Sequence, residues 1–464
     1  MEKNQKQKPL EPAWFNGKAI NAIGFARAFL GAHPMQCVHD RLYDENGCLA
    51  DEEVRQMVFA EAEPYLIHGD VGKAVQNLTN ALKLRAHAEE LPMQADRVHF
   101  ANGTYCLDGA FSPKKQICRN RLPVNYDLNA PRPGRWLAFL RELLYEEDIP
   151  AFQEYLGYLL IPSTRAQQML LLIGNGGEGK SRIGRVLRAI LGDNMNPGAL
   201  AKFRFCQGGR RSRLENPPGF QPCSIVKLAT NRFARADLEG KLLMLDDDMN
   251  MSALPDTNTL KSIITMEDKI DIERKDKQSY QGYLYARLIG FGNGSLAALY
   301  DKSEGFYRRQ LILKVRDKPP DRVDDPYLGD RLIQEAEGIA LWCLEGLHRL
   351  MRNRFHFTIS ERTRRNMAEL RHIDNNVLDF LESTGYIRFD PAVSATTKEL
   401  FLAYRRWCED NVEKPFTERT FSTILRNNEG KWNISYDKNL DAGYGKKARG
   451  YHGVQVLFDT IQEP

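Results

Sequence analysis

The sequence of 464 residues predicts an α/β protein built around a parallel β-sheet, with a mostly helical N-terminal domain and a small C-terminal domain. Three observations predict this fold class. Apolar strands alternate with helical segments from residue 168 to about residue 315. Before residue 100, apolar side chains recur at helical spacing, as in 70–88. After residue 366, two helical segments precede two strands that flank a basic loop.

Composition places the chain among globular proteins and argues against several other classes. Apolar residues make up 42% of the chain and charged residues 27%, which is ordinary for a soluble domain. The eight cysteines show no CxxC spacing, so neither a zinc site nor a disulfide framework is predicted. Apolar runs reach about six residues, whereas a membrane helix needs about 20, and no apolar signal segment opens the chain. We therefore expect a cytoplasmic protein with no membrane partner.

The N-terminal part contains a hairpin signal among its helices. Two β-prone runs surround Asn102-Gly103, the dipeptide most typical of a tight hairpin turn, so we expect a hairpin near 98–107. Helices predicted at 136–145 and 149–160 then lead into an apolar strand. The expected parts of the chain are a helical N-terminal domain at 1–145, a nucleotide-binding core at 146–320, a helical linker or lid at 321–365 and a C-terminal domain at 366–464.

The apolar strand 169–173 is followed by a loop that fits the phosphate-binding pattern GxxxxGK[ST]. Its glycines let the backbone curl, and a helix that begins near Lys180 would point its N–H groups at an anion. Lys180 is expected to reach the β- and γ-phosphates of ATP, and Ser181 to hold Mg²⁺. The alternative is a glycine turn between a core strand and a core helix. The loop consists of Gly174, Asn175, Gly176, Gly177, Glu178, Gly179, Lys180 and Ser181.

Two further strands end in polar side chains. The apolar run 241–245 ends in three aspartates. We expect Asp246 to hold Mg²⁺, mostly through water, and Asp247 to orient or deprotonate the attacking water, with Asp248 as the alternative to Asp247. The strand 287–292 ends at Asn293, whose amide is expected to sense the γ-phosphate and help position the water, although Asn-Gly is also a common turn.

Two arginines open the next apolar strand. Arg309, with Arg308 as the second candidate, is expected to reach the γ-phosphate bound by a neighbouring subunit and to stabilise charge in the transition state. The alternative is a solvated basic edge.

A basic hairpin is predicted between the second and third strands. Ile270 and Ile272 alternate with charged residues, and the segment then presents Arg274, Lys275 and Lys277. Because the formal net charge is only +4, a nucleic-acid signal must come from such local clusters. These cations are suited to grip backbone phosphates, although a soluble turn has the same composition. A second basic cluster, at 202–213, fits a phosphate-binding site and a simple loop equally well.

The C-terminal part has the outline of a winged helix. A long amphipathic helix is expected at 330–351. A capping box at 396–399 then opens another helix, and a further helix is expected at 417–426. We expect the basic loop that follows to bind DNA. It lies between strands predicted at 432–436 and 454–458 and carries Lys446, Lys447 and Arg449.

These motifs, in this order, resemble the superfamily 3 DNA helicases, AAA+ ATPases of viruses, phages and plasmids that assemble as hexamers around DNA. The block 241–247 followed by 272–277 looks like the papillomavirus replicative helicase. In that protein a DNA-gripping hairpin carries a lysine followed by a histidine. Here Lys275 matches the lysine, but Asp276 stands where the histidine would be.

The closer resemblance is to the helicase half of phage and plasmid primases, which is related to the poxvirus primase-helicase. It rests on 100–105, 149–181, 305–315 and 398–408, and it extends over roughly residues 90 to 464. No acidic primase motif and no zinc-binding cysteines are present, so the resemblance implies a helicase and not a polymerase.

The resemblance implies an ATP-dependent replicative helicase of a phage, plasmid or other mobile element. Its expected form is a homohexameric ring that moves 3′ to 5′ on single-stranded or forked DNA, with room for a separate primase or polymerase as partner. The alternative is an ATP-switched, origin-binding initiator or helicase loader with little processive unwinding. A small-molecule kinase is disfavoured by the aspartate-rich strand, the Asn293 strand tip and the winged-helix outline.

Overall fold

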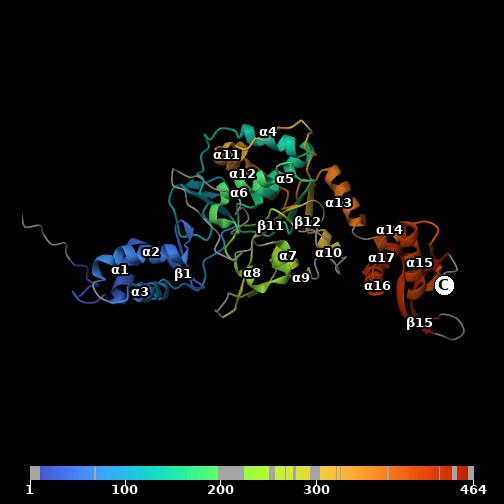
Figure 1. The fold of residues 1–464 in the computed structure, drawn as a ribbon, viewed down its shortest axis with the longest axis horizontal. Coiled ribbons are helices and arrows are strands. Elements are labelled where there is room, and N and C mark those ends of the chain that lie inside the picture. Colours follow the sequence, from blue (N-terminus) through green and yellow to red (C-terminus); the bar gives the residue numbers. More distant parts are fainter. Residues whose placement is uncertain are drawn as a thin grey trace, which may run out of the picture.

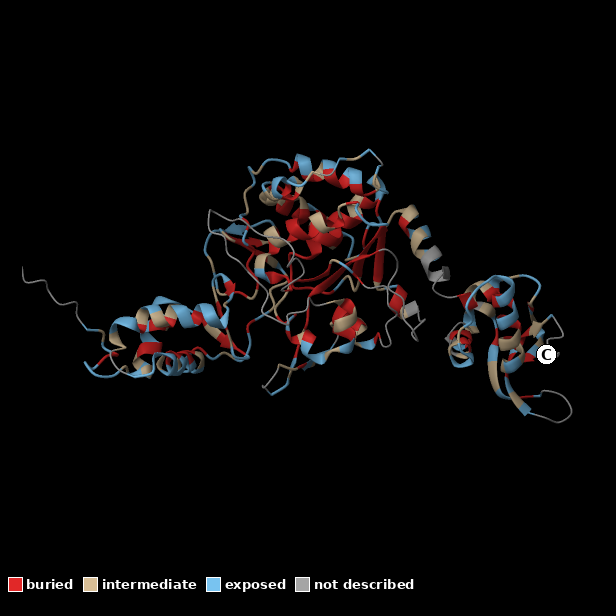
Figure 2. Ribbon diagram, in the orientation of Figure 1, coloured by how far each residue is buried: buried red, intermediate tan, exposed pale blue. Residues whose placement is uncertain are grey.

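The computed structural model describes residues 11–66, 69–196, 224–249, 257–266, 268–274, 278–292, 304–319, 321–323, 325–373, 376–427, 429–441 and 447–457. A small helical unit, a larger α/β unit and a second small unit follow one another along the long axis (Figure 1). Buried residues are most abundant in the strands and covering helices of the central unit (Figure 2). Among the helices described, none combines the length and the apolar composition needed to span a bilayer.

The N-terminal unit packs three helices around its own apolar core. The third of them agrees with the helix predicted at 70–88. A three-stranded antiparallel sheet was not predicted, because strands of two to four residues are too short to show a period. The elements are α1 (Ala22–Ala32), β1 (Gln36–Val38), β2 (Arg41–Asp44), β3 (Gly47–Cys48), α2 (Asp51–Ala62), η1 (Glu63–Tyr65) and α3 (Val71–Arg85).

The predicted hairpin is confirmed as β4 (Arg97–Phe100) and β5 (Gly103–Cys106), which pair antiparallel. A third short strand, β6 (Phe111–Ser112), extends it. Glycine is required at 103, because a Cβ there would lie 2.3 Å from the Ser112 carbonyl oxygen.

The two predicted helices that follow the hairpin are also confirmed. They are α4 (Gly134–Leu143) and α5 (Ile149–Tyr158), separated by η2 (Glu146–Asp148). Most of α5 is buried, as expected for a helix enclosed between other elements.

The central sheet has four parallel strands in the order β12-β7-β11-β8. This confirms the predicted α/β class. Since all four strands run the same way, the loops that follow them meet at one edge of the sheet. The strands are β7 (Met169–Ile173), β8 (Leu243–Asp246), β11 (Arg287–Gly292) and β12 (Gln310–Lys314).

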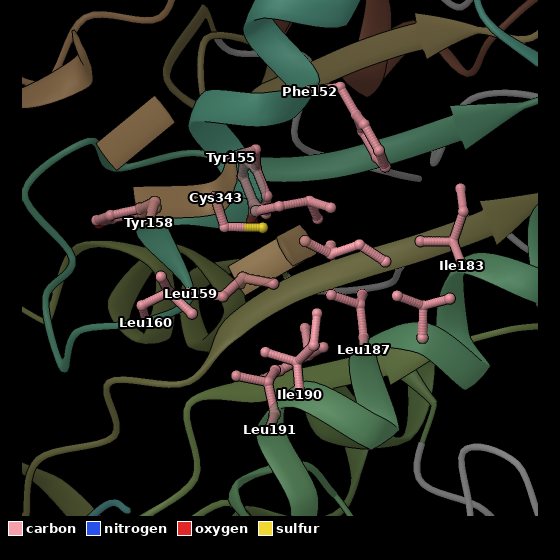
Figure 3. Close-up of a cluster of buried hydrophobic side chains, with 14 of the residues drawn as sticks. Phe152, Tyr155, Tyr158, Leu159, Leu160, Ile183, Leu187, Ile190, Leu191 and Cys343 are labelled. Carbon is pink, nitrogen blue, oxygen red and sulfur yellow. The ribbon is translucent and has the colours of Figure 1, made fainter. Parts of the chain in front are cut away.

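Helices cover both faces of the central sheet. Successive residues of a strand point to opposite faces, so Leu170 and Leu172 join one core while Leu171 and Ile173 join the other. Figure 3 shows the first core, where Phe152 and Tyr155 of α5 lie near the side chains of α6 and Cys343. That face is covered by α4, α5, α6 (Lys180–Leu191) and α12 (Ala336–Arg352), and the other by α7 (Ile225–Thr230), α8 (Arg232–Ala236) and α9 (Asn258–Thr265).

The prediction of a single long helix at 330–351 is wrong. The structure has a short helix, α11 (Leu328–Ile333), followed by α12, with a break around Glu335. The Glu335 carboxylate accepts hydrogen bonds from the backbone N–H groups of Arg135 (3.2 Å) and Trp136 (3.0 Å). It thereby satisfies free donors at the start of α4, which is a contact between segments 200 residues apart.

The C-terminal unit has a separate core beneath a three-stranded antiparallel sheet, β13-β15-β14. The predicted capping box of Thr396 and Glu399 is confirmed. The strand boundaries were wrong, because Trp432 ends a helix, and β13 was missed. Helix α13 (Glu361–Ile373) contacts β12 of the central sheet and leads into this unit. The elements of the unit are α14 (Asn376–Glu382), β13 (Ile387–Thr396), α15 (Thr397–Asp410), α16 (Glu418–Asn427), α17 (Glu429–Trp432), β14 (Ser435–Asp441) and β15 (Lys447–Val456).

Candidate nucleotide-binding site

Backbone hydrogen bonds join the loops at the carboxyl edge of the central sheet. The Gly174 N–H donates to the Gly292 carbonyl (3.0 Å), and the Met249 N–H donates to the Phe291 carbonyl (2.9 Å). These bonds bring the loops after β7 and β8 to the end of β11. A pocket of about 410 Å³ lies there, lined by the phosphate-binding loop, the acidic loop after β8 and the last residues of β11.

The loop after β7 has the curled backbone that its glycines predict. Gly176, Gly177 and Gly179 have φ angles of 103°, 79° and 111°, in the region that side chains other than glycine rarely adopt. The helix α6 begins at Lys180, as predicted, and its first residues line the pocket. The first N–H groups of a helix have no partner within the helix, so this end of α6 is suited to an anion.

The sequence pattern gives Glu178 no role beyond its place in the loop, but the structure gives it a specific partner. Its Oε2 lies 2.8 Å from the Lys180 ammonium nitrogen, and its Oε1 accepts a hydrogen bond from the Gly176 N–H (2.7 Å). Burial by itself raises the pKa of Glu178, but the hydrogen bonds from Lys180 and the loop backbone outweigh it and the pKa is lowered. The carboxylate is therefore ionised and holds Lys180 along the loop.

The three aspartates after β8 occupy different positions. Asp247 and Asp248 line the pocket opposite the phosphate-binding loop. Asp246 is 6% exposed, and its Oδ2 accepts a hydrogen bond from the Ile225 N–H (2.9 Å). Burial raises the pKa of the Asp246 carboxyl group, against the effect of its backbone hydrogen bonds. The structure thus brings Asp247 and Asp248 to the pocket, whereas Asp246, the predicted Mg²⁺ ligand, is buried at the end of β8 and does not line it. Their individual roles remain predictions.

Arg322 is a pocket residue that the sequence analysis missed. Its guanidinium donates to the carbonyl oxygens of Gly177 and Glu178, both at 2.8 Å. The same segment of the chain supplies Asp317, whose Oδ1 accepts from the Asn175 side chain (2.8 Å). Neither residue belongs to a local motif, so only the tertiary contact reveals them.

Arg308 and Arg309 lie at the opposite edge of the sheet from the pocket. The Arg309 carbonyl accepts from the Met169 N–H (2.8 Å) at the beginning of β7, whereas the pocket lies at its end. Five residues of strand separate the two edges by about 16 Å. Arg308 is exposed, and the Arg309 guanidinium donates to the Gly305 carbonyl (2.5 Å). The structure does not bring either arginine to the pocket of its own chain.

The predicted basic hairpin has two paired strands, β9 (Ile270–Ile272) and β10 (Tyr280–Gly282). Arg274 differs from the prediction of a free phosphate-binding cation. Its guanidinium pairs with Glu239 and donates to the Tyr280 hydroxyl (3.0 Å) and the His39 carbonyl (3.1 Å). With 15% of its side chain exposed, Arg274 anchors the base of the hairpin in this structure.

Several predicted residues lie outside the described part of the chain. They are Lys275, Lys277, Asn293, Lys446 and the basic cluster at 202–213. Of the remaining C-terminal candidates, Lys447 and Arg449 are exposed at the start of β15.

Comparison with known proteins gives a family model and a shared fold. The model described as a family of unknown function, DUF5906, matches residues 172–309, from the β7 strand to Arg309. No curated protein matches the chain. The A form apo structure of the NrS-1 C-terminal region has a TM-score of 0.50 and 13% identity, over 92% of this chain and 98% of that one.

Two further structures, of residues 305–718 of NrS-1, give TM-scores of 0.48 with 13% and 14% identity. They cover 93% and 94% of this chain, and 99% of the NrS-1 chain in each case. The A form structure shows that this chain has the fold of the NrS-1 C-terminal region along most of its length.

Proposed function

We propose that the chain is an ATP-dependent replicative DNA helicase of a phage, plasmid or other mobile element. In this proposal the central unit is an AAA+ core of the superfamily 3 type, and the C-terminal unit is a winged helix. The observation that carries the proposal is the pocket in which Lys180 and the start of α6 face Asp247 and Asp248. A curled glycine loop opposite carboxylates is the arrangement that phosphoryl transfer requires.

The residues at the pocket are suited to ATP with Mg²⁺. Ser181 offers a hydroxyl oxygen, and Asp247 and Asp248 line the same pocket, with the buried Asp246 next to them in the chain. The described residues contain no cluster of three metal-binding side chains. A pocket lined by two carboxylates suits Mg²⁺, which binds one or two carboxylates and takes its other oxygen ligands from phosphates and water. Mg²⁺, when bound, would neutralise charge on the phosphates.

The proposed roles of the protein groups follow from their positions. Lys180 and the N–H groups at the start of α6 would bind the β- and γ-phosphates. Asp247 or Asp248 would orient the attacking water, and Asn293 would help to position it.

The position of the two arginines supports a ring of subunits. Because Arg308 and Arg309 lie about 16 Å from the carboxyl edge, they would serve the pocket of the adjacent protomer. Such a head-to-tail interface closes into a ring when the rotation between subunits is right, and we propose a homohexamer.

DNA binding is proposed for the hairpin and the C-terminal unit. Lys275 and Lys277 would contact backbone phosphates from the β9–β10 hairpin, and Lys446, Lys447 and Arg449 from the loop before β15. Hydrolysis would then move the hairpin together with the DNA strand. The polarity proposed, 3′ to 5′, comes from the family resemblance.

The test is strand displacement on a forked duplex with a 3′ single-stranded tail. The wild-type chain should hydrolyse ATP and release the labelled strand, whereas Lys180→Ala should do neither. Lys18→Ala, which removes an exposed lysine of the N-terminal unit, is the matched control and should act as wild type. Hydrolysis without displacement would favour the initiator or loader instead. Absence of ATP hydrolysis from the wild type would contradict both.

A further inference from the structure

A second cavity, of about 700 Å³, lies where the N-terminal unit meets the central unit. One wall comes from the β2–β3 region and from the segment that carries Lys115 and Arg119. The opposite wall comes from the end of α6 and from the segment that leads into β8, including Arg188 and Lys241. We call this cavity the basic cleft. It is separate from the nucleotide pocket, with which it shares no lining residue.

The described residues that line the basic cleft include seven arginines and lysines and five carboxylates. Two of these carboxylates, Asp40 and Asp51, bind the Lys83 ammonium group at 3.1 Å and 2.9 Å, and Lys83 does not itself line the cleft. Lys83 therefore offsets one of these two negative charges from outside the cavity.

A third carboxylate, that of Glu239, is shared between two cations of the cleft. It lies 3.3 Å from Arg41 and also pairs with Arg274. One negative charge is thus paired with two positively charged guanidinium groups. The cleft retains more positive than negative charge after these pairs are formed.

The cations on the two walls donate mainly to backbone carbonyls. Arg188 donates to the carbonyls of Gly192 (3.0 Å) and Asn196 (2.8 Å), and Lys241 donates to that of Asp193 (2.5 Å). Across the cleft, the Nε of Arg119 donates to the Leu91 carbonyl (2.5 Å). A carbonyl orients a cation but carries no net charge, so the positive charge is not cancelled.

Lys241 lies near two other cations of the cleft, Arg41 and Arg188. Burial lowers the pKa of its ammonium group, Cys48 and Asp193 raise it, and the charges of Arg41 and Arg188 lower it further. An anion in the cleft would relieve this repulsion in a region partly withdrawn from water.

The position of the cleft indicates which anion it binds. Arg274 lines the cleft and is the last described residue before the hairpin tip that carries Lys275. The cleft therefore adjoins the segment proposed to grip DNA. Its cations come from two units and face each other across a large cavity, which suits a chain of phosphates better than one compact anion. We propose that the basic cleft binds the backbone phosphates of single-stranded DNA and leads the strand to the hairpin. This inference rests on the proposed function.

The test measures binding of a fluorescein-labelled oligothymidylate of about 30 nucleotides to the full chain, by fluorescence anisotropy. The double variant Lys115→Gln/Arg119→Gln removes two cations of one wall. Lys18→Gln/Lys73→Gln removes two exposed lysines of the N-terminal unit that do not line the cleft. We expect the cleft variant to bind at least about tenfold more weakly than the control. The slope of the logarithm of the binding constant against the logarithm of the salt concentration should become shallower by about 1.4, that is about 0.7 for each lost phosphate contact on a single strand.

A variant that binds DNA more tightly tests the inference without the risk that the variant has merely misfolded. Glu53 lines the cleft and is exposed, whereas its neighbour Glu52 does not line it. Glu53→Gln should tighten DNA binding by more than Glu52→Gln does. ATP hydrolysis without DNA should be unchanged in both variants, since neither residue lies at the nucleotide pocket.

The remaining outcomes distinguish this inference from the proposed function. If the cleft variants bind the oligonucleotide as the controls do while Lys275→Ala weakens binding, the basic cleft is not a DNA site and the helicase proposal stands. If inorganic phosphate binds to the wild type but not to the cleft variant, while both bind the oligonucleotide equally well, the cleft takes small anions and the DNA assignment is wrong. If the wild type binds no oligonucleotide, both proposals fall.

Discussion

Glu178 occupies a position that the phosphate-binding pattern leaves free, and its carboxylate binds the invariant lysine of that pattern. The Lys180 ammonium group must face phosphate oxygens if it is to bind a triphosphate, so Glu178 competes for it. The same carboxylate accepts from the Gly176 N–H and so helps to hold the loop in its curled form. The residue therefore stabilises the loop at a cost in affinity for an anion.

We predict that Glu178→Gln binds ATP about tenfold more tightly, since loss of a competing interaction of about 1.4 kcal/mol between the two charges equals a factor of ten. The amide oxygen can still accept from the Gly176 N–H, so the loop should keep its form. The measurement is a titration with a fluorescent ATP analogue. Glu142→Gln, at an exposed position of α4, is the control and should match the wild type. A lower affinity in the Glu178 variant would show that the carboxylate supports nucleotide binding.

We predict that Arg322→Ala weakens ATP binding by about tenfold or more, because hydrogen bonds from a charged donor contribute about 1.5–3 kcal/mol. The variant loses the bonds to the Gly177 and Glu178 carbonyls, which fix the loop that would surround the phosphates. The same titration measures the effect. Arg316→Ala removes an arginine of the same segment whose guanidinium donates to the Arg141 carbonyl, away from the pocket. Equal losses in the two variants would contradict a specific role for Arg322.

At the scale of elements, local patterns predicted most of the central unit. The apolar runs of β7, β8 and β11, and the glycines after β7, are short-range features of the sequence. The hairpin of β4 and β5 was predicted from two β-prone runs on either side of Asn-Gly, a dipeptide that favours a tight turn. Parallel pairing then brings the polar ends of β7 and β8 to one edge, so the position of the pocket followed from the order of the strands.

The features that the sequence analysis missed depend on tertiary contacts. The break between α11 and α12 occurs where Glu335 caps α4, a partner 200 residues away in the chain. The sheet of β1 to β3 has strands too short for a period to be visible. Arg274 was assigned to phosphate from its charge, whereas Glu239, which binds it, comes from a different element. Charge patterns show which residues carry charge but not which partner neutralises them.

The hairpin of β4 and β5 contains a histidine that should make stability depend on pH. Burial lowers the pKa of His99 to about 4, and Arg121 and Arg97 add to the effect. Its ring nitrogens bond the Thr104 hydroxyl (2.9 Å) and the Gln94 side chain (2.6 Å). Between pH 6.5 and about 4, the unfolded chain binds a proton at His99 that the folded chain does not.

We therefore predict that proton binding to His99 in the unfolded chain lowers the free energy of unfolding by on the order of 3 kcal/mol as the pH falls from 6.5 to about 4. The loss of stability begins near the pKa of His99 in the unfolded chain and is complete below its pKa in the folded chain. Chemical denaturation of the wild type and of His99→Gln over this range measures the effect, and the variant should show the shallower decline. His33→Gln, at an exposed site, should decline as the wild type does. Parallel declines in the wild type and His99→Gln would contradict the prediction.

At the scale of the whole molecule, the two edges of the central sheet carry complementary halves of the proposed active site. The carboxyl edge holds the pocket with Lys180, and the opposite edge holds Arg308 and Arg309. A single chain can bring together only the first half. Activity in the proposal therefore depends on an interface in which one protomer's pocket meets the arginine edge of the next.

A mixture of two inactive variants tests this arrangement. Lys180→Ala and Arg309→Ala should each abolish ATP hydrolysis when assayed alone. In an equimolar mixture that assembles at random, about a quarter of the interfaces join an intact Lys180 to an intact Arg309, because each side is intact in half of the protomers. Hydrolysis should then recover to at most about a quarter of the wild-type rate, and dilution below the assembly concentration should remove it. Arg308→Ala replaces Arg309→Ala in a parallel mixture, so that the arginine that reaches the neighbouring pocket is identified by which pair recovers. Assembled mixtures with no more activity than the separate variants would contradict the contribution of either arginine from the neighbouring subunit.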